Sequence, residues 1–104
     1  MSTRSRYEAE SERLAGLPRA QRFEELIEFP ARHLFKLIGH REGLSDAVMA
    51  ALTALGYPDV ILVERPSARG RYVSLTFDLY VEDGRRLDSV YCALERLPGL
   101  VFLL

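Results

Sequence analysis

The only lysine in the chain is the residue best suited to hold a charged ligand. Lys36 lies within the apolar stretch H-L-F-K-L-I-G, and every other basic side chain is arginine. A lysine ammonium is a compact point charge that an arginine fork does not replace. On a sheet surface it would bind a ligand carboxylate or phosphate, pair with an acid such as Asp78 on a neighbouring strand, or remain solvated.

A second group of cations lies in the sequence R-P-S-A-R-G-R. Arg65, Arg69 and Arg71, together with Ser67 and Gly70, could hold an anion. The alternative is an ordinary hairpin tip, in which glycine supplies a positive φ and the arginines are solvated. The sequence leaves both interpretations open.

No cluster in the sequence amounts to a reaction centre. His33, His40 and Cys92 are the only histidines and cysteine, and their spacing matches no metal site. No catalytic triad, carboxylate pair or phosphate-binding loop accompanies them. We therefore expect a protein that is not an enzyme and that uses no metal or cofactor.

These residues are positioned by one long strand at residues 70–82. Its residues alternate strictly, which predicts a strand with one buried and one polar face. The buried face would carry Val73, Leu75, Phe77 and Leu79. The polar face would carry Tyr72, Ser74, Thr76, Asp78 and Tyr80.

The remaining elements follow from local patterns. Residues 33–39 form an apolar run expected to be a central strand, and 59–66 and 100–104 are further strands. Residues 44–55 and 85–97 have helical periodicity. Pro18 opens a short amphipathic helix over 19–28, with Phe23, Leu26 and Ile27 on one face.

The element order β-α-β-β-α-β predicts an α+β, ferredoxin-like sandwich. Right-handed crossovers place both helices on one face of a four-stranded antiparallel sheet of order 4-1-3-2. Lys36 then lies on the helix-free face, because Phe35 and Leu37 suit the core. Residues 1–18 form a charged extension, weakly ordered or helical, and 19–104 form the domain.

The totals exclude several classes of protein. A chain of 104 residues with net charge −1 lacks the basic excess of a nucleic-acid binder. No apolar run is long enough to span a membrane. A single cysteine forms no internal disulfide, so we expect a cytoplasmic protein.

The stretches E-F-P-A-R-H-L-F-K-L-I-G, S-A-R-G-R-Y-V-S-L-T and L-V-F-L-L resemble the YbeD-like family of small bacterial proteins. The resemblance covers roughly residues 28–104. It implies a fold similar to the ACT regulatory domains of amino-acid metabolism, and a link to lipoate metabolism through neighbouring genes. The positions that match the family and are candidates for ligand binding are Lys36, Gly39, Ser67, Gly70, Tyr72 and Ser74.

The last strand has more apolar surface than one sheet face can bury. Strict alternation would place Leu100, Phe102 and Leu104 on one side, with Val101 and Leu103 on the other. A bare apolar edge strand of this kind favours aggregation, so something must cover it. The helix over 19–28 could do so, or a second subunit could.

The sequence therefore favours a small ACT-like regulatory or adaptor protein. It would act by association through the open sheet face and C-terminal edge strand, as a homodimer or with a partner protein. The alternative is a sensor of an anionic small molecule. A sensor gains thermal stability with its ligand, whereas an adaptor responds only to a protein.

Overall fold

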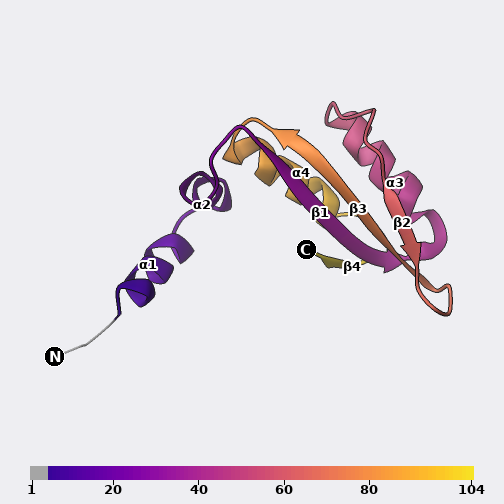
Figure 1. Ribbon diagram of the computed structural model, residues 1–104, viewed down its shortest axis with the longest axis horizontal. Coiled ribbons are helices and arrows are strands. Elements are labelled where there is room, and N and C mark those ends of the chain that lie inside the picture. The colour runs from indigo at the N-terminus through magenta and orange to yellow at the C-terminus, as the bar shows by residue number, and fades with distance from the viewer. Residues whose placement is uncertain (1–4) are drawn as a thin grey trace.

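The long alternating strand is one of two central strands of a four-stranded antiparallel sheet (Figure 1). The computed structural model describes residues 5–104. In chain order the elements are α1 (Arg6–Ala15), α2 (Arg19–Leu26), β1 (Ala31–His40), α3 (Arg41–Ala54), β2 (Val63–Pro66), β3 (Tyr72–Val81), α4 (Gly84–Glu95) and β4 (Leu100–Leu103). The sheet order is β2-β3-β1-β4, which is the expected order read in reverse.

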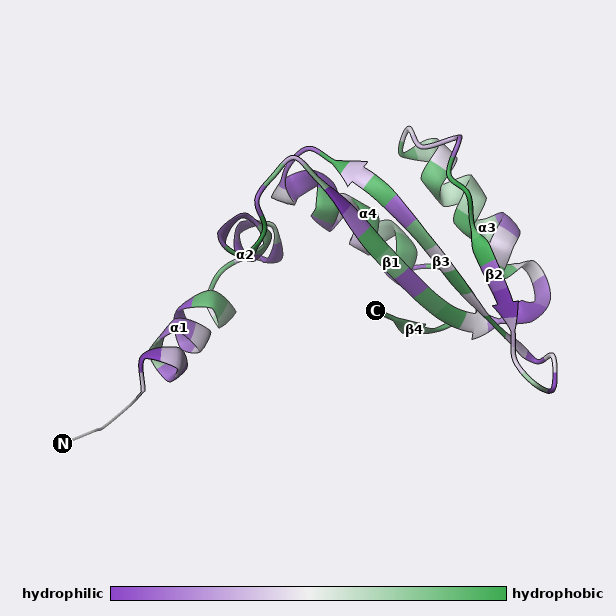
Figure 2. Ribbon diagram, viewed as in Figure 1, coloured by the Kyte–Doolittle hydropathy of each residue, from purple (hydrophilic) through white to green (hydrophobic). Residues whose placement is uncertain are grey.

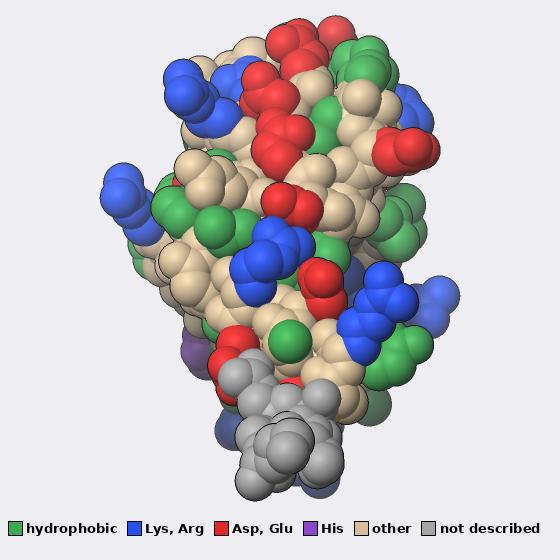
Figure 3. Space-filling view, turned by 90° about the vertical axis from the view of Figure 1, so that its left-hand side faces the viewer, with side chains coloured by type: hydrophobic (Ala, Val, Ile, Leu, Met, Phe, Trp, Pro, Cys, Tyr) green, Lys and Arg blue, Asp and Glu red, His purple; other side chains and the backbone are tan. Residues whose placement is uncertain are grey.

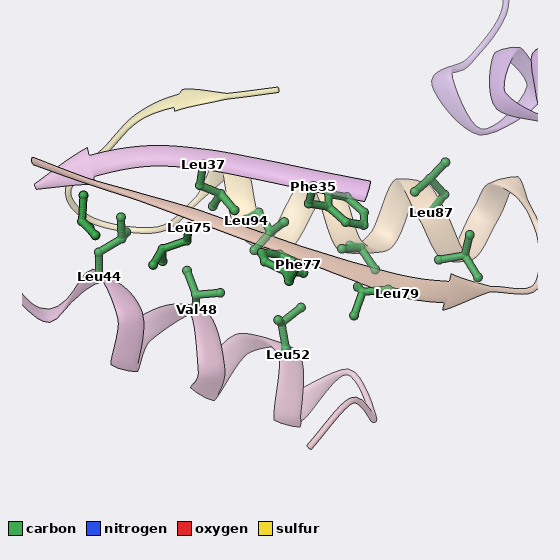
Figure 4. Packing of buried hydrophobic residues seen from close by; sticks show 13 residues of the cluster. Phe35, Leu37, Leu44, Val48, Leu52, Leu75, Phe77, Leu79, Leu87 and Leu94 are labelled. Atoms are coloured by element: carbon green, nitrogen blue, oxygen red, sulfur yellow. The ribbon is translucent and has the colours of Figure 1, made fainter. Parts of the chain in front are cut away.

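The core lies between the sheet and two helices, as the alternation predicts (Figure 4). Phe35 of β1 stacks on Phe77 of β3 with ring centroids 5.3 Å apart. The helices contribute apolar side chains at helical spacing, namely Leu44, Val48 and Leu52 from α3 and Leu87, Val90 and Leu94 from α4. Because α3 and α4 cover the same face, the opposite face of the sheet is left open.

The start of α4 is fixed by a side-chain cap. The Asp83 carboxylate accepts a hydrogen bond from the Arg86 backbone N–H at 2.8 Å, and this bond satisfies one of the free donors of the first turn. The Glu24 carboxylate of α2 accepts from the Gly84 N–H at 2.7 Å. The same turn therefore positions α4 and holds α2 against it.

The expected alternation in the last strand is wrong at Leu100. The pairing of β1 with β4 shifts register between Ile38 and Gly39, so that Phe102 pairs with Ile38 but Leu100 pairs with Gly39. This bulge adds one residue on β4 and changes which side chains face inward. Leu100 and Leu103 pack on the core, whereas Val101 and Phe102 are exposed.

The strand expected at 59–66 is shorter than the sequence indicates. Only the part that forms β2 pairs with β3, and its ladder ends where Val63 meets Thr76. Before that point the Tyr57 hydroxyl donates to the Tyr80 carbonyl of β3 at 2.9 Å and occupies the strand edge. Val60 and Leu62 pack on the core without forming a ladder.

α2, the helix expected over 19–28, does not cover the open sheet face, so the expectation that it could cover the apolar last strand is wrong. α2 lies on α4, where Phe23 stacks on Tyr91 with centroids 5.6 Å apart. Leu26, expected on the same face as Phe23, is 66% exposed. The reason is electrostatic as well as apolar, because Arg19 of α2 forms ion pairs with Asp88 and Glu95 of α4.

α1 extends away from the rest of the chain (Figure 1). It buries no residue, and its Arg13 forms an ion pair with Glu25 of α2. The radius of gyration is 16.5 Å, above the roughly 13 Å of a compact chain of this length. Figure 3 views the molecule from this end and shows acidic and basic side chains interspersed on its surface, which is typical of a solvated segment.

Candidate functional site

Lys36 lies on the open face at the centre of the sheet. It pairs with Thr76 on β3, and its backbone exchanges hydrogen bonds with Leu104. The expected partner Asp78 instead faces Arg32, with nitrogen and oxygen 3.7 Å apart. Within residues 5–104 no ion pair includes Lys36, so its ammonium is available to a ligand or a partner chain.

Gly39 has a structural role that the sequence does not reveal. A Cβ at this position would lie 2.5 Å from the Gly99 carbonyl oxygen and 2.8 Å from Cδ2 of Leu44. Gly39 is also buried, so it presents no surface to a ligand. Its glycine identity is explained by the close approach of β4 to β1.

Ser67 and Gly70 build the hairpin between β2 and β3. The Ser67 N–H donates to the Tyr72 carbonyl at 2.9 Å, and the Ser67 hydroxyl accepts from the Tyr72 N–H at 3.2 Å. Gly70 donates its N–H to the Ser67 carbonyl and has φ of 72°, in the left-handed region. The backbone N–H groups of Ser67 and Gly70 are engaged within the turn, whereas the Ser67 hydroxyl serves there only as an acceptor.

Tyr72 and Ser74 lie beside this hairpin on the open face. The Tyr72 ring packs against His40 with centroids 5.2 Å apart, and Ser74 pairs with Ile38 across the sheet. Ser67, Tyr72 and Ser74 line one shallow pocket together with Arg65. The structure therefore brings the hairpin candidates to one end of the sheet, whereas Lys36 lies further along it.

The open face carries an apolar patch around Lys36. Leu34 and Ile38 flank Lys36 on β1, and Leu104 and Phe102 lie opposite Lys36 and Ile38 beside β4. Figure 2 shows β4 as an almost uniformly hydrophobic strand. The exposed members of the patch are Leu34 at 66%, Val101 at 45%, Phe102 at 60% and Leu104 at 65%.

An unpaired strand edge adjoins this patch. Lys36 directs its N–H and C=O toward Leu104, and alternation along an antiparallel ladder directs those of Leu34 and Arg32 the same way. The ladder with β4 does not reach them. Among residues 5–104, no backbone group is bonded to Arg32 or Leu34 on that side.

A polar and aromatic cluster joins β1 to the two helices below it. The His33 ring nitrogen lies 3.0 Å from the Tyr91 hydroxyl, and Arg19 lies over the Tyr91 ring. Burial lowers the pKa of His33 and raises the pKa of Tyr91. Cys92 accepts a hydrogen bond from Arg19 at 3.3 Å. The cluster holds α2 in place.

A separate hollow lies at the opposite edge of the sheet. Its volume is about 340 Å³, and its walls are β3 near Asp78 and Tyr80, the segment of residues 56–61 and the Arg32 side chain of β1. None of the residues matched to the family lies in it. Among the described residues, no group of three or more His, Cys, Asp or Glu side chains could hold a metal ion.

Sequence reasoning missed Arg32 and Arg41. Arg32 precedes the strand predicted at 33–39, yet it lies on β1 opposite Tyr80. Arg41 follows β1 and donates its N–H to the Arg71 carbonyl at 3.0 Å. Extending the predicted strand by two residues toward the N-terminus would have included Arg32. No local pattern in the sequence indicates the contact between Arg41 and Arg71.

These features define a small α+β domain of ACT-like, ferredoxin-like fold with an open sheet face. The ACT domain from GTP pyrophosphokinase of Chlorobium tepidum superposes with a TM-score of 0.54 at 11% identity, covering 70% of this chain and 94% of that domain. Protein HP0495 from H. pylori gives a TM-score of 0.65 at 15% identity, covering 75% and 85%. At these identities the similarity shows the fold.

The chain belongs to the family described as Protein of unknown function (DUF493), whose profile matches residues 24–104. A UPF0250 protein from Shewanella piezotolerans is 32% identical over 80 residues, covering 76% of this chain and 91% of that protein. One from Haemophilus ducreyi is 30% identical over 92 residues, covering 88% and 94%. The resemblance to the YbeD-like family is thereby confirmed.

The comparisons leave activity unassigned, since the family is one of unknown function. In the part of the chain that the structure describes, no helix is both long and apolar enough to cross a membrane. Function must therefore be argued from the surfaces described above.

Proposed function

We propose that this protein is a non-enzymatic, ACT-like regulatory or adaptor protein of the cytoplasm that acts by binding a second copy of itself through the open sheet face. The observation that carries the proposal is the exposed apolar patch of Leu34, Val101, Phe102 and Leu104 beside β4. Contiguous exposed apolar side chains mark interaction surfaces in soluble proteins.

The unpaired edge of β1 would orient a second copy bound at the apolar patch, because hydrogen bonds are directional and apolar contacts are not. Arg32 and Leu34 offer strand-type donors and acceptors next to the patch. An added strand would satisfy them, and strand addition is a common mode of recognition. A second copy carries the same apolar patch and the same unpaired strand edge, and a two-fold interface uses the same surface on both subunits.

The expected affinity is moderate. Full burial of a Leu, Val or Phe side chain contributes roughly 1.5–3 kcal/mol. The four patch side chains begin about half exposed, so they supply roughly 3–6 kcal/mol before the cost of association. With the added backbone hydrogen bonds, this supports a dissociation constant in the micromolar range or weaker.

Sedimentation equilibrium from about 5 to 500 µM tests the proposal. Wild-type protein should show a concentration-dependent dimer, and Leu34→Glu should be monomeric throughout. Ile61→Glu is the matched control, because Ile61 is 81% exposed but lies at the opposite edge of the sheet. A monomer at every wild-type concentration, or equal loss of association in both variants, contradicts the proposal, as does association only with a different protein.

A second candidate function is the sensing of an anionic metabolite at Lys36. The observation that favours it is an exposed ammonium without an ion pair among residues 5–104, opposite Thr76 at the sheet centre. The family resemblance, with its link to lipoate metabolism, makes lipoate the first ligand to test. A ligand should raise the unfolding temperature of the wild type by mass action and leave Lys36→Gln unchanged. Equal shifts in both proteins would exclude Lys36 as the site.

A further inference from the structure

The hairpin tip and the start of α3 come together although they are distant in sequence. The Arg41 N–H donates to the Arg71 carbonyl at 3.0 Å, which joins the end of β1 to the tip. A Cβ placed on Gly70 would lie 3.3 Å from Nη1 of Arg41, so this guanidinium lies over the turn. Arg41, Gly70 and Arg71 line one shallow pocket with Glu42.

The turn itself is well fixed. Hydrogen bonds between Ser67, Gly70 and Tyr72 close the tip, and Gly70 has the positive φ that this turn requires. On the other side of the tip, Arg69 and Arg71 line a second shallow pocket with Tyr72. The backbone that carries Arg69 and Arg71 is thus fixed by hydrogen bonds within the turn.

The charges at this end are unbalanced. Arg41, Arg65, Arg69 and Arg71 are exposed, and within residues 5–104 none of them belongs to an ion pair. Arg13, Arg19 and Arg32 elsewhere are paired. With the acids Glu42 and Glu64, these four arginines carry a net charge of +2, whereas the whole chain carries −1.

We propose that Arg41, Arg69 and Arg71 form a binding site for the phosphate group of a small molecule. A single carboxylate is satisfied by one guanidinium fork, whereas two or more forks match the oxygens and double charge of a phosphate. Arg71 is common to both shallow pockets of the tip, the one that Arg41 lines and the one that Arg69 lines. Tyr72, whose ring packs against His40, lines the pocket of Arg69 and Arg71 and would contact the body of the ligand. This inference goes beyond self-association and is separate from the Lys36 site.

Amide chemical-shift titration of the full chain with inorganic pyrophosphate, at constant ionic strength, tests the proposal. The expected result is saturable binding with a dissociation constant of about 1 mM or lower, and shifts centred on Arg41, Gly70 and Arg71. Arg41→Gln and Arg71→Gln should each weaken binding about tenfold, because each removes one charged fork. Arg96→Gln is the matched control, since Arg96 is an exposed arginine at the end of α4.

A further variant removes the only acid that lines the Arg41 pocket. Glu42→Gln should tighten pyrophosphate binding severalfold, since the carboxylate opposes the anion. No saturable binding, or equal effects of the tip and Arg96 variants, overturns the proposal. Equal binding of sulfate, or tighter binding of a single-stranded oligonucleotide, overturns the assignment to a small phosphate ligand. Loss of binding only in Lys36→Gln would overturn this site and support the sensor function at the sheet centre.

Discussion

Gly39→Ala is expected to destabilise the protein severely, although alanine is the smallest possible addition. The new Cβ would lie 2.5 Å from the Gly99 carbonyl oxygen, which also accepts the His40 N–H at 2.8 Å. The second close atom, Cδ2 of Leu44, can rotate away, but the carbonyl is backbone and cannot. Ordinary contact begins at 3.4 Å, so β4 must retreat by about 1 Å from β1.

The cost can be estimated from two contributions. Overpacking of a filled site costs about 1–3 kcal/mol. The weakened hydrogen bond between His40 and Gly99 costs roughly 1 kcal/mol more. The sum is about 3 kcal/mol, and a domain of this size loses roughly 4–8 °C per kcal/mol. The unfolding temperature should therefore fall by about 15 °C.

Thermal unfolding followed by circular dichroism measures this fall, with Gly43→Ala as the control. Gly43 has φ of 78°, and no atom lies within 4 Å of the position that a Cβ would take there, so alanine meets conformational strain alone. Its expected cost is about 1 kcal/mol, or roughly 5 °C. If the two variants unfold at the same temperature, the steric account of Gly39 is refuted.

Three further predictions concern the helix side. Burial lowers the pKa of His33 below its ordinary 6.5, so the contribution of neutral His33 to stability is full above pH 6.5 and is lost as pH falls through the lowered pKa. His33→Phe should therefore flatten the decline in the free energy of unfolding below pH 6.5. Arg19→Gln should speed proteolysis within α2, while the free energy of unfolding of the whole domain falls by only about 1 kcal/mol because the broken ion pairs are partly exposed. Unchanged cleavage would show that the ion pairs of Arg19 do not anchor α2. Asp83→Ala should lower the free energy of unfolding, measured in urea, by about 1 kcal/mol because it removes the α4 cap. Asp83→Asn should retain most of the capping stabilisation, because asparagine is also a favourable N-cap residue.

The fold could be predicted because its central elements follow local rules. The alternation in β3 places Val73, Leu75, Phe77 and Leu79 in the core, and the structure confirms all four. The element order then leaves one sheet topology consistent with right-handed crossovers, and the observed order matches it.

The features that could not be predicted depend on contacts between distant segments. The bulge at Ile38 and Gly39 changes the face of Leu100, and strict alternation gives no sign of it. β2 begins only at Val63, and the Tyr80 carbonyl on the edge of β3 accepts a hydrogen bond from the Tyr57 hydroxyl instead of from a strand residue. Arg19 directs α2 to α4 through charges that are almost seventy residues away in sequence, as its partner Asp88 shows.

The candidate site was predictable only in part. Lys36 lies on the open face as expected, because its neighbours Phe35 and Leu37 are buried. Its expected partner Asp78 is taken by Arg32, a residue outside the predicted strand. Gly39 has a structural role, and Arg41 joins the hairpin only through the tertiary fold.

Hydrogen exchange at two protein concentrations tests the proposed self-association most directly. The backbone amides of Arg32 and Leu34 lie on the unpaired edge beside the apolar patch, so a second copy should protect them. Their exchange should slow at high concentration, while that of Ile61 stays constant. Exchange at Arg32 and Leu34 that is equally fast at both concentrations would contradict the account.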